Sequence, residues 1–126
     1  MLTRLLAAVA IVCALGACAM APTADQLASA DYGAQPQHPE TAIHLYFETT
    51  LKDPSSAQYR EITKPVHGWI RDPIVAGGKT NYGWQVDVAV NAKNSYGAYV
   101  GFKTYSFLFR GEEIVDLITP DTIMVP

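Results

Sequence analysis

The stretch Y82-G-W-Q-V-D-V-A-V90 alternates between large apolar side chains and smaller or polar ones. Successive side chains of a β-strand point to opposite faces of a sheet, so this alternation predicts a half-buried strand. The predicted buried face carries Tyr82, Trp84, Val86, Val88 and Val90. The predicted water-facing side carries Gly83, Gln85, Asp87, Ala89 and Asn91.

A helix is predicted upstream of this strand, over P39-E-T-A-I-H-L-Y-F-E-T-T-L-K52. Pro39 suits the first turn of a helix, and D53-P54 provides a stop. Large side chains recur at the spacing that forms one helix face, namely at Ile43, Tyr46, Phe47, Thr50 and Leu51.

The remaining segments have strand-like composition. They are A57–T63, V66–R71, A98–F109 and E113–I118, with R110-G111 as a tight turn. One helix followed by consecutive strands predicts an α+β fold, with one N-terminal amphipathic helix packed on an antiparallel sheet of about four or five strands. We place this domain at residues 39–120 and a C-terminal tail at residues 121–126.

The N-terminus resembles a secretory signal. Arg4 is the one charge before an apolar run from Leu5 to Leu15, which is too short for a membrane span of about 20 residues. We assign residues 1–17 to this signal. Residues 18–38 are rich in Ala, Gln, Pro, Asp and Ser, and we expect them to form a flexible tether, with one helical turn near Asp25–Ala30.

The sequence L15-G-A-C18 resembles the lipobox of bacterial lipoproteins. This resemblance implies that the Cys18 thiol receives a diacylglycerol, that the chain is cut before Cys18 and that the new amino terminus is acylated. Ala19 in the following position implies retention in the outer membrane, with the domain facing the periplasm. Ordinary secretion remains an alternative, because A17-C-A19 and A19-M-A21 also match a small-x-small cleavage pattern.

Charge and cysteine content narrow the possible functions. Without the signal, eight Lys and Arg residues face twelve Asp and Glu residues, with no basic cluster for nucleic acid. Cys18 would be the one mature cysteine, so no disulfide is expected. The histidines have no partner at metal-ligand spacing, and we predict neither a metal nor another cofactor.

The loop V90-N-A-K-N-S-Y-G-A-Y-V-G-F102 has the Asn, Ser and Gly residues that a hairpin connection requires. Lys93 and Tyr96 are not needed for a turn, and either could contact a partner. The next strand has large apolar groups on both faces. Either a bulge near Gly101 or burial of both faces puts Phe107 and Phe109 in the core, or the sheet has an aromatic docking face. The candidate partner-binding residues are Lys93, Tyr96, Tyr99, Lys103, Tyr105 and Phe107.

Three segments, L51-K-D-P-S-S-A57, V90-N-A-K-N-S-Y-G97 and G101-F-K103, are similar to those of a family of small, uncharacterised bacterial envelope lipoproteins. The similarity covers roughly residues 43 to 118. It implies an envelope location and transfers no activity. D53-P-S-S56 is interpreted as a helix stop and turn, not as the surroundings of a catalytic serine.

No catalytic residues can be assigned from the sequence. The serines lack a nucleophile elbow, and G77-G-K-T80 lacks the full phosphate-binding pattern. The sequence therefore favours a binding or accessory module with an envelope protein partner. The alternative is a small periplasmic enzyme or ligand-binding protein whose site has no recognisable motif.

Overall fold

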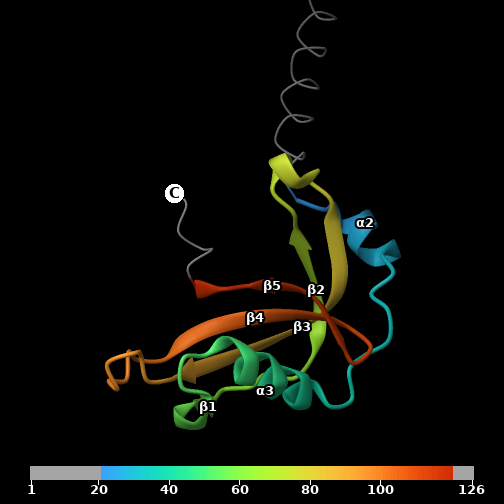
Figure 1. The fold of residues 1–126 in the computed structure, drawn as a ribbon. Helices are drawn as coiled ribbons and strands as arrows, with labels where there is room; N and C mark the ends of the chain where they lie inside the picture. Colours follow the sequence, from blue (N-terminus) through green and yellow to red (C-terminus); the bar gives the residue numbers. More distant parts are fainter. Residues whose placement is uncertain (1–20, 121–126) are drawn as a thin grey trace, which may run out of the picture. The chain divides into compact units, whose positions relative to one another are not determined.

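The computed structural model describes residues 21–120 (Figure 1). Contacts divide the chain into two compact units, Met1–Ala30 and Asp31–Pro126. In the described part of the first unit, helix α2 (Ala24–Ser29) begins at Thr23 with a capping box, in which the side chains of Thr23 and Gln26 each accept the other's backbone N–H. The predicted signal, Cys18 and the C-terminal tail lie outside the described residues.

The second unit contains helix α3 (Pro39–Thr50), two short 3-10 helices and an antiparallel sheet of five strands. The 3-10 helices are η2 (Pro54–Ser56) and η3 (Ile74–Ala76). The strands are β1 (Gln58–Arg60), β2 (Val66–Arg71), β3 (Thr80–Asn91), β4 (Lys103–Arg110) and β5 (Glu113–Ile118). The α+β class and the antiparallel sheet predicted from the sequence are confirmed.

Strand β3 is the centre of the sheet. It pairs with β4 along one edge, and its other edge pairs with β2 near its start and with β1 near its end. Strand β5 then pairs with β4. The 12-residue β3 curves strongly, so that its two ends run in different directions (Figure 1).

Two paired glycines lie where β3 curves. Gly83 is in register with Gly68 of β2, and both are buried. A Cβ atom on Gly83 would lie 2.4 Å from the backbone oxygen of Phe109, and one on Gly68 would lie 2.7 Å from the Cβ of Gln85. Glycine at both positions therefore permits a close approach of strands that a side chain would block.

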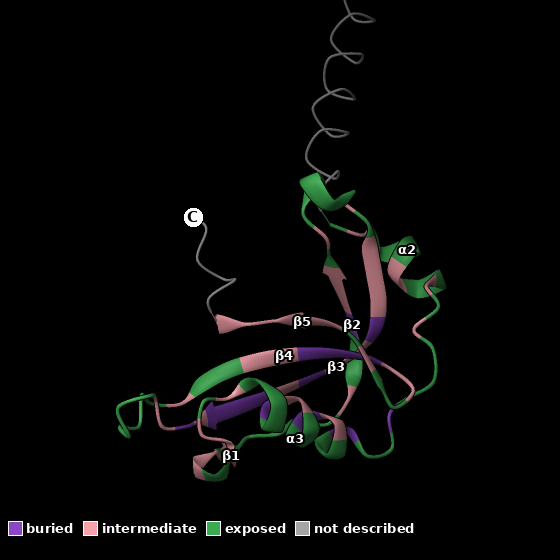
Figure 2. Cartoon of the chain, in the orientation of Figure 1, coloured by how far each residue is buried: buried purple, intermediate pink, exposed green. Residues whose placement is uncertain are grey.

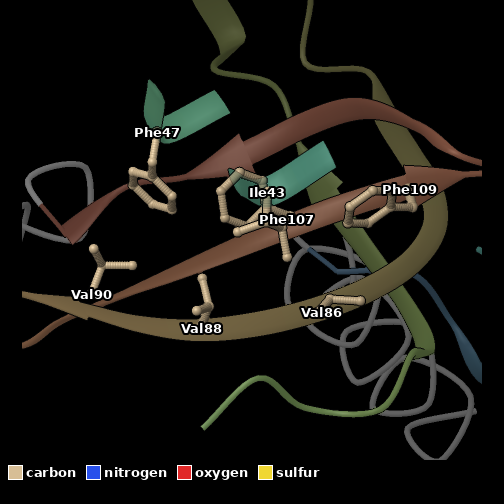
Figure 3. Packing of buried hydrophobic residues seen from close by; sticks show 7 residues of the cluster. All are labelled: Ile43, Phe47, Val86, Val88, Val90, Phe107 and Phe109. Atoms are coloured by element: carbon tan, nitrogen blue, oxygen red, sulfur yellow. The ribbon is translucent and has the colours of Figure 1, made fainter. Parts of the chain in front are cut away.

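The core forms between α3 and one face of the sheet (Figure 3). Ile43 and Phe47 from α3 meet the alternating valines of β3 and two phenylalanines of β4. The full cluster is Ile43, Phe47, Val86, Val88, Val90, Phe107 and Phe109. The prediction that the valines of β3 face the core is confirmed, and full burial of each large side chain contributes about 1.5–3 kcal/mol to stability.

The opposite face of the sheet is also partly covered. Leu108 is fully buried there, and Ala89 is 4% exposed (Figure 2). The interpretation that both faces of β4 are buried therefore holds for Phe107, Leu108 and Phe109, near the end of this strand. The predicted bulge near Gly101 is wrong, because the register irregularity lies between Leu108 and Phe109, where β4 pairs with β5.

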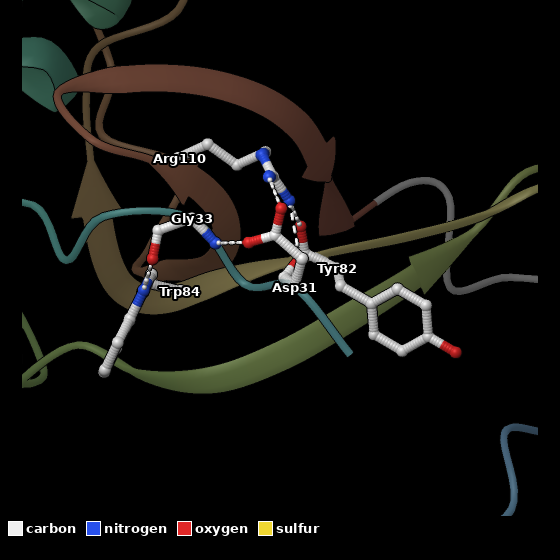
Figure 4. A network of polar contacts seen from close by, with 5 residues as sticks. All are labelled: Asp31, Gly33, Tyr82, Trp84 and Arg110. Carbon is white, nitrogen blue, oxygen red and sulfur yellow. Dashed lines mark hydrogen bonds and ion pairs between the residues drawn. The ribbon is translucent and has the colours of Figure 1, made fainter. Parts of the chain in front are cut away.

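Residues 31–38 form a strap across the sheet rather than part of a tether. The strap's Asp31 makes an ion pair of 3.1 Å with Arg110, and the indole Nε1 of Trp84 donates a 3.0 Å hydrogen bond to the carbonyl oxygen of Gly33 (Figure 4). The ring of Tyr32 stacks on His67 with a centroid separation of 3.9 Å. The compact unit therefore begins at Asp31 and not at residue 39.

Carboxylates fix both ends of the strap. The hydrogen bond from the backbone N–H of Gly33, followed by the contact with Arg110, lowers the pKa of Asp31. At the other end, Glu112 accepts hydrogen bonds from the backbone N–H groups of Gln37 and His38. The bond from Gln37 is the main cause of the lowered pKa of Glu112. These contacts were missed because composition alone does not show which distant residues will meet.

Candidate functional site

The segments L51–A57 and V90–F102, far apart in the sequence, meet at the end of the sheet where β3 and β4 are joined. Ser56 is the point of contact. Its Oγ accepts a 2.9 Å hydrogen bond from the backbone N–H of Lys93 and donates one of 2.7 Å to the carbonyl oxygen of Asp53. The hydroxyl of Tyr99 donates a 3.0 Å bond to the carbonyl oxygen of Ser56. We call residues 51–57 and 91–102 together the loop end.

The loop end holds its own backbone in place. The Oδ1 of Asn94 accepts hydrogen bonds from the backbone N–H groups of Tyr96 and Ala98, and the Oδ1 of Asn91 accepts one from Gly101. Gly97 has a φ of +77°, which most residues adopt only with strain. These features are those of a hairpin connection, as the sequence predicts.

The side chains of residues 95–101, at the tip of the loop end, are exposed (Figure 2). Tyr96 is 94% exposed, Val100 54% and Tyr99 45%. No hydrogen bond that fixes this backbone uses the ring of Tyr96. An exposed aromatic ring on a well-bonded loop is therefore available to a partner at little cost in backbone order.

Cations lie over two aromatic rings of the loop end. The guanidinium carbon of Arg60 is 3.7 Å from the ring centroid of Phe102, and the Nζ of Lys93 is 5.5 Å from that of Tyr99. Cation–π contacts at exposed sites contribute about 0.5–1 kcal/mol each. They also keep positive charge beside these two rings, where an acidic group of a partner could meet it.

The structure separates the six candidate residues into two groups. Lys93, Tyr96 and Tyr99 belong to the loop end, and Lys103 is exposed beside it at the start of β4. Tyr105 is partly buried, with its ring 4.9 Å from that of Phe47.

Phe107 is fully buried, so its assignment to a docking face is wrong. The strand alternation was read correctly, but the sequence does not show which face α3 covers. That helix covers the aromatic face of β4, and Gln85 and Asp87, predicted to face water, lie on the other face.

Two residues of the site were not predicted, namely Arg60 and Phe102. The motif G101-F-K103 contains Phe102, but no binding role was predicted for this residue from the sequence. No sequence motif pointed to Arg60, because its position depends on the pairing of β1 with β3, where Arg60 is in register with Ala89.

The serines of this region have structural contacts. The Oγ of Ser55 donates a 2.7 Å hydrogen bond to the Oδ1 of Asp53, and both hydrogen bonds of the Ser56 hydroxyl are to backbone groups. Segment 53–56 is thus a 3-10 turn after α3, as predicted. Within residues 21–120, no group of three His, Cys, Asp or Glu side chains is placed to hold a metal ion.

A cavity of about 560 Å³ lies elsewhere, between the strap, the start of α3 and residues 62–65. Its lining includes the charged residues Glu40 and Lys64 together with Pro36, Pro39 and Ile62. In the described part of the chain no polar or charged side chain is classed as buried. This cavity therefore lacks a buried polar group with which to orient a ligand.

Comparisons with known proteins give no relative: no protein family matches the sequence, and no curated protein or solved structure is significantly similar to it. The family suggested by the three motifs stays a prediction. None of the helices described between residues 21 and 120 has the length and apolar character needed to cross a membrane.

Proposed function

We propose that the protein is a lipoprotein of the bacterial outer membrane, anchored through Cys18, whose domain faces the periplasm and binds an envelope protein through the loop end. The sequence L15-G-A-C18 supports the anchor. The meeting of the three family-like motifs at the loop end supports the position of the binding surface.

The observation that carries the proposal is the exposed ring of Tyr96 on an internally bonded loop. Binding energy at protein interfaces is concentrated in a few residues, and tyrosine is enriched among them. A loop whose backbone is already ordered loses little further entropy when it binds. Tyr96 is therefore the residue whose loss should weaken partner binding most.

The charges of this end indicate the chemistry of the partner. Three cationic side chains lie on or beside the loop end, namely those of Arg60, Lys93 and Lys103. One carboxylate is also present, that of Asp53, and it accepts a hydrogen bond from Ser55. Charge complementarity favours a partner with an acidic surface. A lipid anchor would raise the effective concentration of such a partner when both are held at the same membrane.

The anchor is tested by metabolic labelling. We expect the full chain, expressed in a bacterium with radiolabelled palmitate, to incorporate label and to fractionate with the outer membrane. The Cys18→Ala variant should lose the label. An unlabelled wild-type chain would show that the anchor is absent.

The binding surface is tested by photo-crosslinking in native envelopes. A photoreactive phenylalanine at position 96 should give a dominant crosslinked product, whereas the same group at Leu45, which is 61% exposed on α3, should not. The product should disappear when Lys93 and Tyr99 are both changed to Ala. Equal products from positions 96 and 45 would contradict a specific surface at the loop end.

A further inference from the structure

The tip of the β2–β3 hairpin is apolar and points away from the core. Ile74 is 83% exposed and Val75 is 98% exposed, and Pro73 and Ala76 beside them are also exposed (Figure 2). The tip lies at the opposite end of β3 from the loop end (Figure 1). Exposed apolar residues gathered in this way usually mark a contact surface.

We infer that this tip, residues 73–76, contacts the surface of a membrane that contains anionic phospholipids. The inference deepens the proposed function, because it rests on the chain being held at a membrane. It assigns the tip to the lipid surface and leaves the loop end free for a protein.

The backbone of the tip is suited to an apolar layer. The carbonyl oxygen of Pro73 accepts hydrogen bonds from the N–H groups of Ala76 and Gly78, and that of Ile74 accepts one from Gly77. At the base, the N–H of Asp72 donates to the carbonyl oxygen of Lys79. Backbone groups that enter lipid must be satisfied within the chain, and much of this tip already satisfies that condition.

The charges at the base fit anionic headgroups. Arg71 and Lys79 flank the tip and are exposed. The long side chain of Lys79 can keep its charge in the headgroup layer while the tip lies deeper. The nearby carboxylate of Asp72 accepts a 3.1 Å hydrogen bond from the Nδ2 of Asn81, which lies within the sheet. Within residues 71–79 two cations stand against one carboxylate, so this end of the hairpin carries a net positive charge.

The start of the compact unit also lies against this hairpin. The compact unit begins at Asp31, and the next residue, Tyr32, packs against His67 of β2 and Tyr82 of β3. The compact unit therefore begins beside β2 and β3, the two strands that carry the tip.

The size of the tip favours lipid over a protein partner. A stable protein interface buries about 800 Å² on each side, far more than one turn with two large side chains offers. Two apolar side chains with flanking cations are sufficient for a weak interfacial contact that a separate anchor reinforces.

A fluorescence experiment tests the inference without relying on lipidation. The chain from residue 18 onward, with Cys18→Ala and an N-terminal histidine tag, is held on phosphatidylcholine–phosphatidylglycerol vesicles through a nickel-chelating lipid. A single Val75→Cys is labelled with the dye NBD. The matched control is Tyr96→Cys, labelled in the same way, since positions 75 and 96 are almost equally exposed at opposite ends of β3.

At position 75 we expect a blue-shifted emission, an intensity rise of about twofold or more, and quenching by lipids with brominated chains, as for a dye that enters the interface. The signal should fall when phosphatidylglycerol is omitted or when Lys79→Glu is introduced. Position 96 should show none of these changes. Equal signals at the two positions, or no quenching at position 75, would overturn the inference, whereas failure of palmitate labelling would overturn the anchor alone.

Discussion

The strap and the loop end both lie outside the core and both contain aromatic side chains, but they use them differently. In the strap, Tyr32 stacks on His67, and Asp31 pairs with Arg110. At the loop end, asparagine and serine side chains fix the backbone, and the ring of Tyr96 remains 94% exposed. The stacked ring of Tyr32 in the strap stabilises the fold, whereas the exposed ring of Tyr96 at the loop end is available to another molecule.

This difference shows that aromatic composition alone does not identify a binding surface. The two regions differ in the contacts that hold their backbones in place. The strap is ordered by side chains that reach the sheet, so removing them should loosen it. The loop end is ordered by hydrogen bonds between asparagine, serine and Tyr99 side chains and nearby backbone groups. The ring of Tyr96 makes none of these bonds, so it can be removed without loss of structure.

The largest effect is expected at a residue that belongs to neither region. Phe107→Ala should destabilise the domain by about 3–5 kcal/mol, because a fully buried ring that contacts Phe47 is replaced by a cavity. Urea unfolding followed by circular dichroism measures this loss. If the variant were as stable as the wild-type domain but failed to bind a partner, Phe107 would belong to a docking face after all.

A smaller effect is expected where the loop end is joined to the turn after α3. Ser56→Ala should cost about 1–3 kcal/mol, because the N–H of Lys93 loses its acceptor in a partly buried position. Ser55→Ala is the matched control, since the exposed Ser55 bonds only the side chain of Asp53, and it should change stability by about 0.5 kcal/mol or less. Equal effects of the two changes would show that Ser56 does not hold the loop.

The parts of this fold that depend on local pattern could be predicted, and the parts that depend on distant contacts could not. Alternation along β3 identified the buried valines, and Pro39 with D53-P54 marked the limits of the helix. The strap was not found, because its polar, proline-containing sequence has no periodicity and its partners, Arg110 and Glu112, come more than 70 residues later. The same limit applies to Phe107 in the candidate site, since periodicity separates two faces without saying which one a helix will cover.

Acid should loosen the strap before the rest of the domain. The pKa values of Asp31 and Glu112 are lowered in the folded protein, so their contributions are present above the unfolded values of about 4. They are lost as the pH falls below 4 and passes through the lowered values. The fluorescence of Trp84, whose N–H binds the oxygen of Gly33, reports this change when Trp69 is replaced by Phe.

The control for this acid effect is the pair of substitutions Asp31→Asn and Glu112→Gln. These changes remove both titrating carboxylates, so the change in Trp84 fluorescence between pH 5 and pH 3 should largely disappear. An unchanged acid transition in this double variant would show that other carboxylates control the strap.

The smallest effect on stability is expected at Tyr96, where the effect on binding should be the greatest. Tyr96→Ala removes a ring that is 94% exposed, while the hydrogen bond from its backbone N–H to Asn94 is retained. The free energy of unfolding should therefore change by no more than about 0.5 kcal/mol. Urea unfolding of this variant, read together with its crosslinking from a photoreactive group at position 99, separates the two roles. Retained stability with lost crosslinking is the result that a binding surface requires. Retained crosslinking would show that the exposed ring is not used, because a residue at the centre of an interface cannot be removed without loss of affinity.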